Sequence, residues 1–100
     1  MHLILWEYRV APERLEEFEA LYRPGGAWTS LFHGSLGYVS TTLWRDDRES
    51  GRFIVADRWT SAAAYDAFKR DHETAYAALS ERGSRLYRSE SELGRFTVVE

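Results

Sequence analysis

The sequence of 100 residues contains no cysteine, no asparagine and no glutamine, and it has only two prolines. The absence of cysteine excludes disulfide bonds, thiolate metal sites and thiol nucleophiles. Lys and Arg (13) are outnumbered by Asp and Glu (16), which gives a formal net charge of −3. This balance argues against a nucleic-acid partner, because nucleic-acid affinity comes largely from clustered Lys and Arg at phosphates.

Long apolar runs are also missing. The first run, residues 1–6, ends at Glu7 and is too short for a signal peptide. No segment approaches the length of a membrane span. We therefore expect a cytoplasmic protein with no membrane partner, folded as a single domain over residues 1–100 with a modest core.

Aromatic residues, in contrast, are abundant at 15% of the chain. Each buries a large area, so these side chains can line either a core or a pocket. Apolar residues alternate over residues 3–10, 38–45, 52–59 and 93–99, which predicts four strands. Residues 86–87 could form an earlier part of the last strand. The polar, turn-forming residues 46–51 predict that the second and third strands form a hairpin.

Two segments show helical spacing instead. The first begins at Pro12, which suits the first turn of a helix, and stops at residues 24–26, with a short irregular or helical piece over residues 27–32. The second begins after Ser61, a candidate N-cap, and ends near Gly83. Its apolar stripe is expected to be continuous and to include His72. The order βαββαβ predicts an α+β, ferredoxin-like fold: an antiparallel sheet with both helices on one face.

The first and third predicted strands carry apolar residues on both faces. Leu3 and Leu5 oppose Ile4 and Trp6, and the third strand shows the same pattern over residues 53–56. The face of the sheet without helices would therefore expose apolar area to water. A second copy of the chain is the commonest way to cover such a face, so we expect a homodimer formed through the sheet faces.

Three segments of the sequence are distinctive: Gly26–His33 with Gly37–Tyr38 and Thr42–Leu43, then Asp57–Ser61 with Ala64–Tyr65 and Phe68, and finally Glu92–Phe96. Together they resemble the antibiotic biosynthesis monooxygenase (ABM) family. The resemblance implies a dimeric α+β barrel with a pocket between the sheet and its helices. It also implies either a monooxygenase that acts on quinols or polycyclic phenols without a cofactor, or a haem-degrading enzyme.

The residues argue against the haem-degrading branch. That branch has an Asn on the first strand, a Trp midway along the second helix and a His near the end of that helix. This chain has no Asn, and it has Phe68 and Ala78 in the two helical regions, while His72 comes a turn or more early. The phenol-oxidising branch needs only aromatic walls, help with deprotonation and stabilisation of negative charge.

His72 is the best candidate base, because imidazole titrates near neutral pH and the stripe would point it toward the sheet. It could equally be a structural histidine. Trp59, at the junction of strand and helix, could donate its indole N–H to a substrate oxygen or anchor the helix against the sheet. Tyr65 could donate to an oxyanion or simply pack. These three residues form the predicted catalytic set.

The predicted substrate-binding residues are aromatic or lie near the distinctive segments: Trp28, Phe32, His33, Tyr38, Trp44, Phe68 and Tyr76. His33 and His72 lack the spacing and the third ligand of a metal site, so no metal is expected. The resemblance to the phenol-oxidising branch implies that no other cofactor is needed, because an electron-rich phenolate can itself pass an electron to O₂. Two alternatives to the enzyme remain open. One is a dimeric module that binds an aromatic small molecule without catalysis, and the other is a scaffold whose aromatics fill the core and interface.

Overall fold

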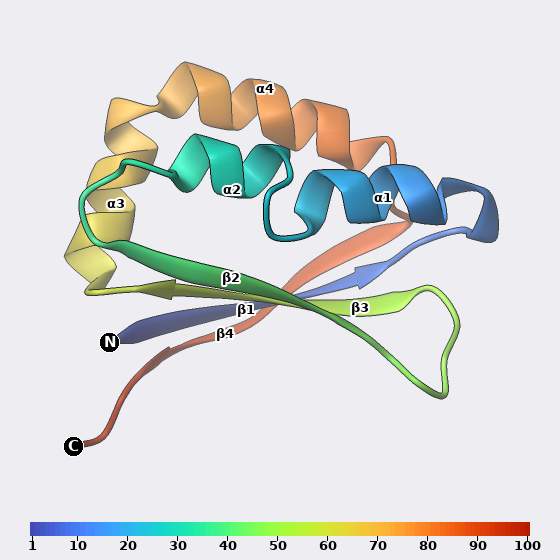
Figure 1. Ribbon diagram of the computed structural model, residues 1–100, viewed down its shortest axis with the longest axis horizontal. Helices are drawn as coiled ribbons and strands as arrows, with labels where there is room; N and C mark the ends of the chain where they lie inside the picture. The colour runs from blue at the N-terminus through green and yellow to red at the C-terminus, as the bar shows by residue number, and fades with distance from the viewer.

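The computed structural model describes residues 1–100 and shows the predicted α+β, ferredoxin-like fold. Its elements, in chain order, are β1 (His2–Arg9), η1 (Pro12–Arg14), α1 (Leu15–Tyr22), α2 (Ala27–Phe32), β2 (Tyr38–Arg45), β3 (Arg52–Trp59), α3 (Ala62–Asp71), α4 (Glu73–Ser84) and β4 (Ser89–Thr97). The helices all lie on one side of the sheet (Figure 1). None of them combines the length and apolar composition needed to cross a bilayer.

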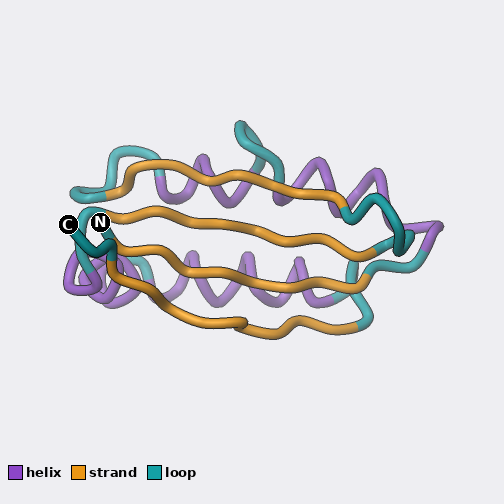
Figure 2. The backbone as a smooth tube through the Cα atoms, turned by 90° about the horizontal axis from the view of Figure 1, so that it is seen from below, coloured by secondary structure: helices purple, strands orange, loops and turns teal.

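The sheet has the strand order β2-β3-β1-β4, and each neighbouring pair is antiparallel. Seen from below, the four strands are uncovered and the helices lie behind them (Figure 2). On β1 the even-numbered side chains Ile4 and Tyr8 face the helices and are buried, as the alternation predicts. We call this the inner face of the sheet and the uncovered one the outer face.

The second helical segment differs from the prediction. Ser61 caps α3 as expected, because its hydroxyl accepts from the backbone N–H of Ala64 at 3.1 Å. The helix is not continuous, however: it breaks at His72, where φ is −122° and ψ is 30°. The break turns the chain so that α4 runs back across the sheet beside α2 (Figures 1 and 2).

The last strand also departs from its predicted bounds. It begins at Ser89, four residues before the predicted start, and residues 86–87 lie outside it. The register slips opposite Leu5 and Trp6, where Gly94 and Glu92 pair with them and Leu93 is bulged out. β4 is an edge strand with mostly exposed side chains, so the apolar alternation that identifies a strand is weak there.

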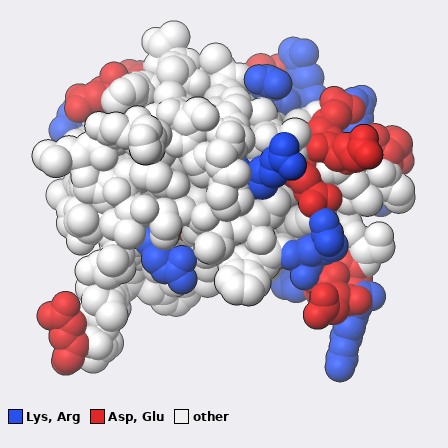
Figure 3. All heavy atoms as spheres, viewed as in Figure 1, with Lys and Arg blue, Asp and Glu red and all other residues white.

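The two faces of the sheet have different characters. The inner face and the helices enclose an aromatic core in which Phe18, Phe53 and Trp59 are almost completely buried. On the outer face, Glu7 forms an ion pair with Arg52 at 2.7 Å near the β2–β3 hairpin. Charged side chains gather at this hairpin end, while the other half of the molecule is largely uncharged in the same view (Figure 3).

Candidate functional site

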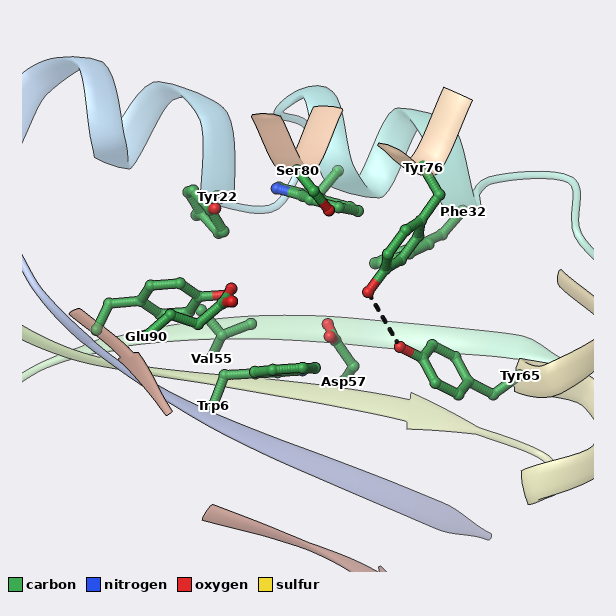
Figure 4. A pocket seen from close by; sticks show the side chains of 11 residues that line it. Trp6, Tyr22, Phe32, Val55, Asp57, Tyr65, Tyr76, Ser80 and Glu90 are labelled. Carbon is green, nitrogen blue, oxygen red and sulfur yellow. Dashed lines mark hydrogen bonds between the residues drawn. The ribbon is translucent and has the colours of Figure 1, made fainter. Parts of the chain in front are cut away.

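A cavity lies between the inner face of the sheet and helices α2 and α4 (Figure 4). The empty space within its walls measures about 430 Å³ including the mouth, and about 50 Å³ can be reached by the centre of a water-sized sphere. Eight of its eleven lining residues are hydrophobic or aromatic. The lining consists of Trp6, Tyr8, Tyr22, Trp28, Phe32, Val55, Asp57, Tyr65, Tyr76, Ser80 and Glu90.

The floor of the cavity comes from three strands. Trp6 on β1, Val55 and Asp57 on β3, and Glu90 on β4 rise from the inner face (Figure 4). Tyr8, also on the inner face of β1, lines the floor next to Glu90. Helices α1, α2, α3 and α4 supply the remaining wall residues. No continuous stretch of sequence forms this site, because its walls come from segments that meet only when the domain packs.

Asp57 is the buried carboxyl group of the cavity, with 6% of the residue exposed. The hydroxyl of Thr41, on the neighbouring strand β2, donates to its Oδ1 at 2.7 Å. Its carboxylate points up into the cavity from the sheet (Figure 4). Burial raises the pKa of Asp57 to about 6, because a charged carboxylate loses its hydration there, and the bond from Thr41 opposes this rise.

A second carboxyl group, Glu90, lies at the other end of the floor, on the far side of Trp6 from Asp57 (Figure 4). It accepts a hydrogen bond of 2.6 Å from the hydroxyl of Tyr8. Burial, followed by the nearby Tyr22, raises the pKa of Tyr8 well above its ordinary value, so this hydroxyl stays protonated. The cavity therefore has polar groups at both ends and aromatic walls between them.

Two tyrosine hydroxyls meet beside Asp57 (Figure 4). Tyr65 on α3 and Tyr76 on α4 point toward each other, with their oxygens 3.4 Å apart (Figure 4). Burial is the main cause that raises the pKa of both tyrosines, so both remain hydrogen-bond donors at neutral pH. The guanidinium of Arg95, on β4, lies 5.3 Å from the centre of the Tyr65 ring.

The cavity also holds an unused donor. Trp28 lines it, is 9% exposed, and its buried Nε1 has no hydrogen-bond partner. The hydroxyl of Tyr22 is a polar neighbour of this N–H, which acts to lower the pKa of that hydroxyl against the larger effect of burial. A ligand oxygen in the cavity could supply the well-aligned acceptor that a buried N–H needs.

Four of the predicted site residues line this cavity: Trp28, Phe32, Tyr65 and Tyr76. Trp59 and Phe68 instead pack in the core with ring centroids 5.3 Å apart, so the anchoring role considered for Trp59 describes its position. His33 and Tyr38 line a separate hollow at the edge of the sheet. Trp44 is 58% exposed, and its Nε1 donates to the hydroxyl of Thr42.

The expectation that His72 points toward the sheet is wrong. His72 is exposed and lies at the break between α3 and α4, outside the cavity. The prediction assumes one unbroken helix, in which helical spacing would turn His72 toward the sheet. The backbone of His72 is not helical, so the helical spacing stops at this residue. No group of three or more His, Asp or Glu side chains is placed to hold a metal ion.

The sequence reasoning missed the groups that give the cavity its polarity, namely Asp57 and Glu90. Asp57 carried a readable signal, because it shares a strand face with Val55 and Trp59 and is the one ionisable residue on the inner face of β3. Glu90 carried none, since it lies in a polar stretch that shows no alternation.

Comparisons with known proteins agree with this fold. A family model described as antibiotic biosynthesis monooxygenase matches residues 1–79. A variant of SnoaB, a cofactor-independent oxygenase from Streptomyces nogalater, aligns with a TM-score of 0.80 and 19% identity, over 99% of this chain and 93% of SnoaB. PA3566 from Pseudomonas aeruginosa aligns with a TM-score of 0.71 and 15% identity, over 99% of this chain and 94% of its own. No curated protein sequence matches significantly.

Proposed function

The chain belongs to the antibiotic biosynthesis monooxygenase family, and on that premise we propose that it oxidises a quinol or related phenol with O₂ and without a cofactor. Two observations support this proposal. The cavity is walled by aromatic rings, which suit a flat aromatic ligand. A structural relative, SnoaB, is described as a cofactor-independent oxygenase.

The observation that carries the proposal is the buried carboxyl group of Asp57 on the cavity floor. With a pKa of about 6, it is mostly ionised at neutral pH and is a stronger base than an ordinary carboxylate. We assign to it the role of the base, which places that role on β3 rather than on His72.

The proposed reaction is quinol + O₂ → hydroxyquinone + H₂O. Asp57 accepts the phenolic proton, and the phenolate passes one electron to O₂. The resulting pair combines to form a C–O bond, which gives a peroxide anion. Asp57 returns its proton to the peroxide and forms a hydroperoxide. The O–O bond then breaks as the hydrogen on the same ring carbon leaves as a proton, so the outer oxygen departs as water and the oxygen still bound to the ring becomes a carbonyl. One atom of O₂ enters the product and the other leaves as water. The substrate supplies all the electrons, so no external reductant is required.

Negative charge develops on oxygen during these steps, and the cavity has donors available for it. The Nε1 of Trp28 is unpartnered, and the hydroxyls of Tyr65 and Tyr76 stay protonated. In an enclosed site with little water, such fixed donors stabilise a developing oxyanion more strongly than they would in water.

The size of the cavity favours a small substrate. The reachable volume of about 50 Å³ corresponds to roughly four water molecules. Four waters fill roughly 120 Å³ of liquid, which is the scale of one aromatic ring with its hydroxyls. We therefore propose a single-ring quinol as the preferred substrate. A polycyclic phenol would require wall residues such as Trp28 or Tyr76 to move.

We further propose that the protein is a homodimer joined through the outer faces of its sheets. No element of the chain covers this face (Figure 2). Its apolar residues include Leu3, Leu5 and Ile54, and Phe96 is 49% exposed beside them. A second copy would bury this area by placing the same patch against itself, as closed twofold symmetry requires.

Oxygen uptake on a panel of single-ring quinols and polycyclic phenols, with no metal or flavin added, tests the proposed reaction. We expect uptake above the buffer rate for a single-ring quinol, and a fall of at least 100-fold in Asp57→Asn. The matched control is Asp47→Asn, the same change at an exposed loop position. Binding without oxygen uptake would replace the enzyme with a small-molecule-binding module, and unchanged turnover in Asp57→Asn would remove Asp57 from the mechanism.

A further inference from the structure

A second hollow lies at the edge of the sheet, between strand β2 and the segment that leads into helix α2. We call it the edge hollow, and it is lined by Pro24, Gly25, Thr29, Ser30, His33, Tyr38, Ser40 and Thr41. Only one of these residues is hydrophobic, and several carry hydroxyl groups. The edge hollow is wider and more open to solvent than the aromatic cavity, and the two share no lining residue.

A chain of hydrogen bonds joins the edge hollow to the cavity. The hydroxyl of Tyr38 donates to Oγ1 of Thr41 at 2.9 Å, and the hydroxyl of Thr41 donates to Oδ1 of Asp57 at 2.7 Å. Tyr38 and Thr41 line the edge hollow, whereas Asp57 lines the cavity. Thr41 is only 6% exposed, so its hydroxyl exchanges hydrogen bonds mainly with these two partners.

An irregularity in β2 makes this chain possible. Residues three apart on a regular strand point to opposite faces of the sheet. The register of β2 against β3 shifts between Tyr38 and Ser40, so Tyr38 pairs with Trp59 while Thr41 pairs with Asp57. Both β2 side chains therefore lie on the inner face, as a bulge allows by re-aiming one side chain.

We propose that Tyr38 and Thr41 form a proton relay, which lets Asp57 exchange protons with solvent while a ligand fills the cavity. Thr41 has one partner on either side, Tyr38 lines the edge hollow, and the two distances are those of ordinary O–H···O bonds. The proposal rests on the role of Asp57 as the base, but its test measures no turnover.

The relay moves a proton without moving electrons. With Asp57 ionised, Tyr38 donates to Thr41 and Thr41 donates to Asp57, which is the direction that brings a proton from solvent to the carboxylate. Once Asp57 is protonated, both hydroxyl groups rotate so that each donates the other way. The carboxyl proton then passes to Oγ1 of Thr41, the Thr41 proton passes to Oη of Tyr38, and the Tyr38 proton passes to solvent. Each hydroxyl group ends with one proton, and Asp57 ends ionised. This resets the base whenever a phenol gives its proton to Asp57 and then leaves as the phenolate.

Other ionisable groups face Asp57 from the elements packed around it. Tyr65 comes from α3, Tyr76 from α4 and Arg95 from β4, while β1 places the apolar Ile4 directly opposite. Glu90 lies at the far end of the cavity (Figure 4). Only Thr41 forms a hydrogen bond with the Asp57 carboxyl group. Removing the Thr41 hydroxyl therefore disconnects Asp57 from Tyr38 and from the edge hollow.

The role of Thr41 can be tested by titrating Asp57 by ¹³C NMR in the ligand-free protein. Thr41→Val keeps the branched shape and removes the hydroxyl, so the ionised carboxylate loses its donor. We expect the titration midpoint of Asp57 to move up by about one pH unit. Thr41→Ser, which keeps the hydroxyl, should titrate like the wild type. A Thr41→Val protein that titrates unchanged would overturn the proposal.

The role of Tyr38 requires a rate measurement. With 4-nitrophenol bound in the cavity, a stopped-flow pH jump follows the ionisation of the probe by its absorbance. We expect Tyr38→Phe to slow this change at least tenfold, and Tyr87→Phe, which removes a hydroxyl outside the relay, to leave it unchanged. Equal rates in Tyr38→Phe and wild type would overturn the relay. If 4-nitrophenol does not enter, the infrared band of the Asp57 carboxyl after the same jump gives the same comparison.

Discussion

The imidazole ring of His72 stacks on the ring of Phe68, with their centroids 5.0 Å apart and their planes 21° apart. Its Nδ1 lies 3.2 Å from the carbonyl oxygen of Phe68. These contacts hold His72 against the last turn of α3, at the break before α4, and keep it outside the cavity. The position of His72 thus fits a residue that ends a helix better than one that takes a proton from a substrate.

We therefore expect His72→Ala to keep its oxygen uptake within about twofold of wild type. The physical reason is that no atom of His72 lines the cavity in which the proposed substrate binds. The measurement is the rate of oxygen uptake on the best quinol of the panel. A loss in His72→Ala as large as that in Asp57→Asn would return the base role to the histidine.

Asp57 should lower the stability of the fold at neutral pH. Its pKa is raised from 3.8 to about 6 by burial, so its contribution to stability is fully present below about pH 3.8 and is lost as the pH rises through about 6. A difference of this size corresponds to about 3 kcal/mol. The free energy of unfolding of Asp57→Asn should therefore exceed that of wild type by up to about 3 kcal/mol at pH 8. At pH 4 the two proteins should have nearly the same free energy of unfolding.

Denaturant unfolding at the two pH values measures this difference. Asp47→Asn is the matched control, because Asp47 is exposed and its replacement should leave stability unchanged at both pH values. An Asp57→Asn variant that is no more stable than wild type at pH 8 would contradict the burial of an ionised carboxylate.

Val55 tests whether the cavity is the binding site. It is 4% exposed and contributes to the floor between Trp6 and Asp57. Val55→Phe would place a ring in the space that the ligand needs, and we expect quinol affinity to fall at least tenfold. Val55→Ile, which adds one carbon, should have a much smaller effect. Quenching of tryptophan fluorescence measures the affinity, because Trp6 and Trp28 line the cavity. Equal affinity in Val55→Phe and wild type, with the fold intact by circular dichroism, would place binding elsewhere.

Gly37 fixes the start of β2 and hence the position of Tyr38. Its φ is +89°, and an added Cβ would lie 2.5 Å from Cβ of Ala64 and 2.7 Å from Oγ1 of Thr60. Gly34 has a similar φ of +87° but open space around it. We expect Gly34→Ala to cost about 1 kcal/mol of unfolding free energy from backbone strain alone. Gly37→Ala should cost more, about 2–3 kcal/mol, because the clash is added. Denaturant unfolding measures the loss of unfolding free energy in both variants. Equal losses in Gly34→Ala and Gly37→Ala would contradict the close approach of α3 to the start of β2.

The proposed homodimer can be tested by introducing glutamate at two different positions. Leu5→Glu places a charge in the apolar patch of the outer face, whereas Leu36→Glu places it in a loop at a residue that is 95% exposed. We expect Leu5→Glu to be monomeric and Leu36→Glu to match wild type as a dimer, because a buried unpaired charge is costly. Size-exclusion chromatography with light scattering gives the masses. A monomeric wild-type protein would refute the assembly.

Several features of the fold were determined locally and could be predicted. The alternation on β1 identified its inner face, the polar residues 46–51 marked the hairpin, and Ser61 supplied the hydroxyl that caps α3. The confirmed order of strands and helices follows from such signals, since each depends on residues close together in the chain. The start of β4 was not predicted, because the exposed side chains of an edge strand need little apolar alternation.

Local patterns along the chain were thus enough to predict the α+β fold, the shortage of positive charge and the supply of aromatic side chains. Tertiary packing selects which of those aromatics surround a cavity, because the surrounding elements come from both ends of the chain. It also decided that His72 lies outside and that Asp57 lies inside, joined to Thr41 of the neighbouring strand. Periodicity assigns a side chain to a face, but burial and hydrogen-bond partners depend on packing between distant segments, and those two properties set the pKa of Asp57.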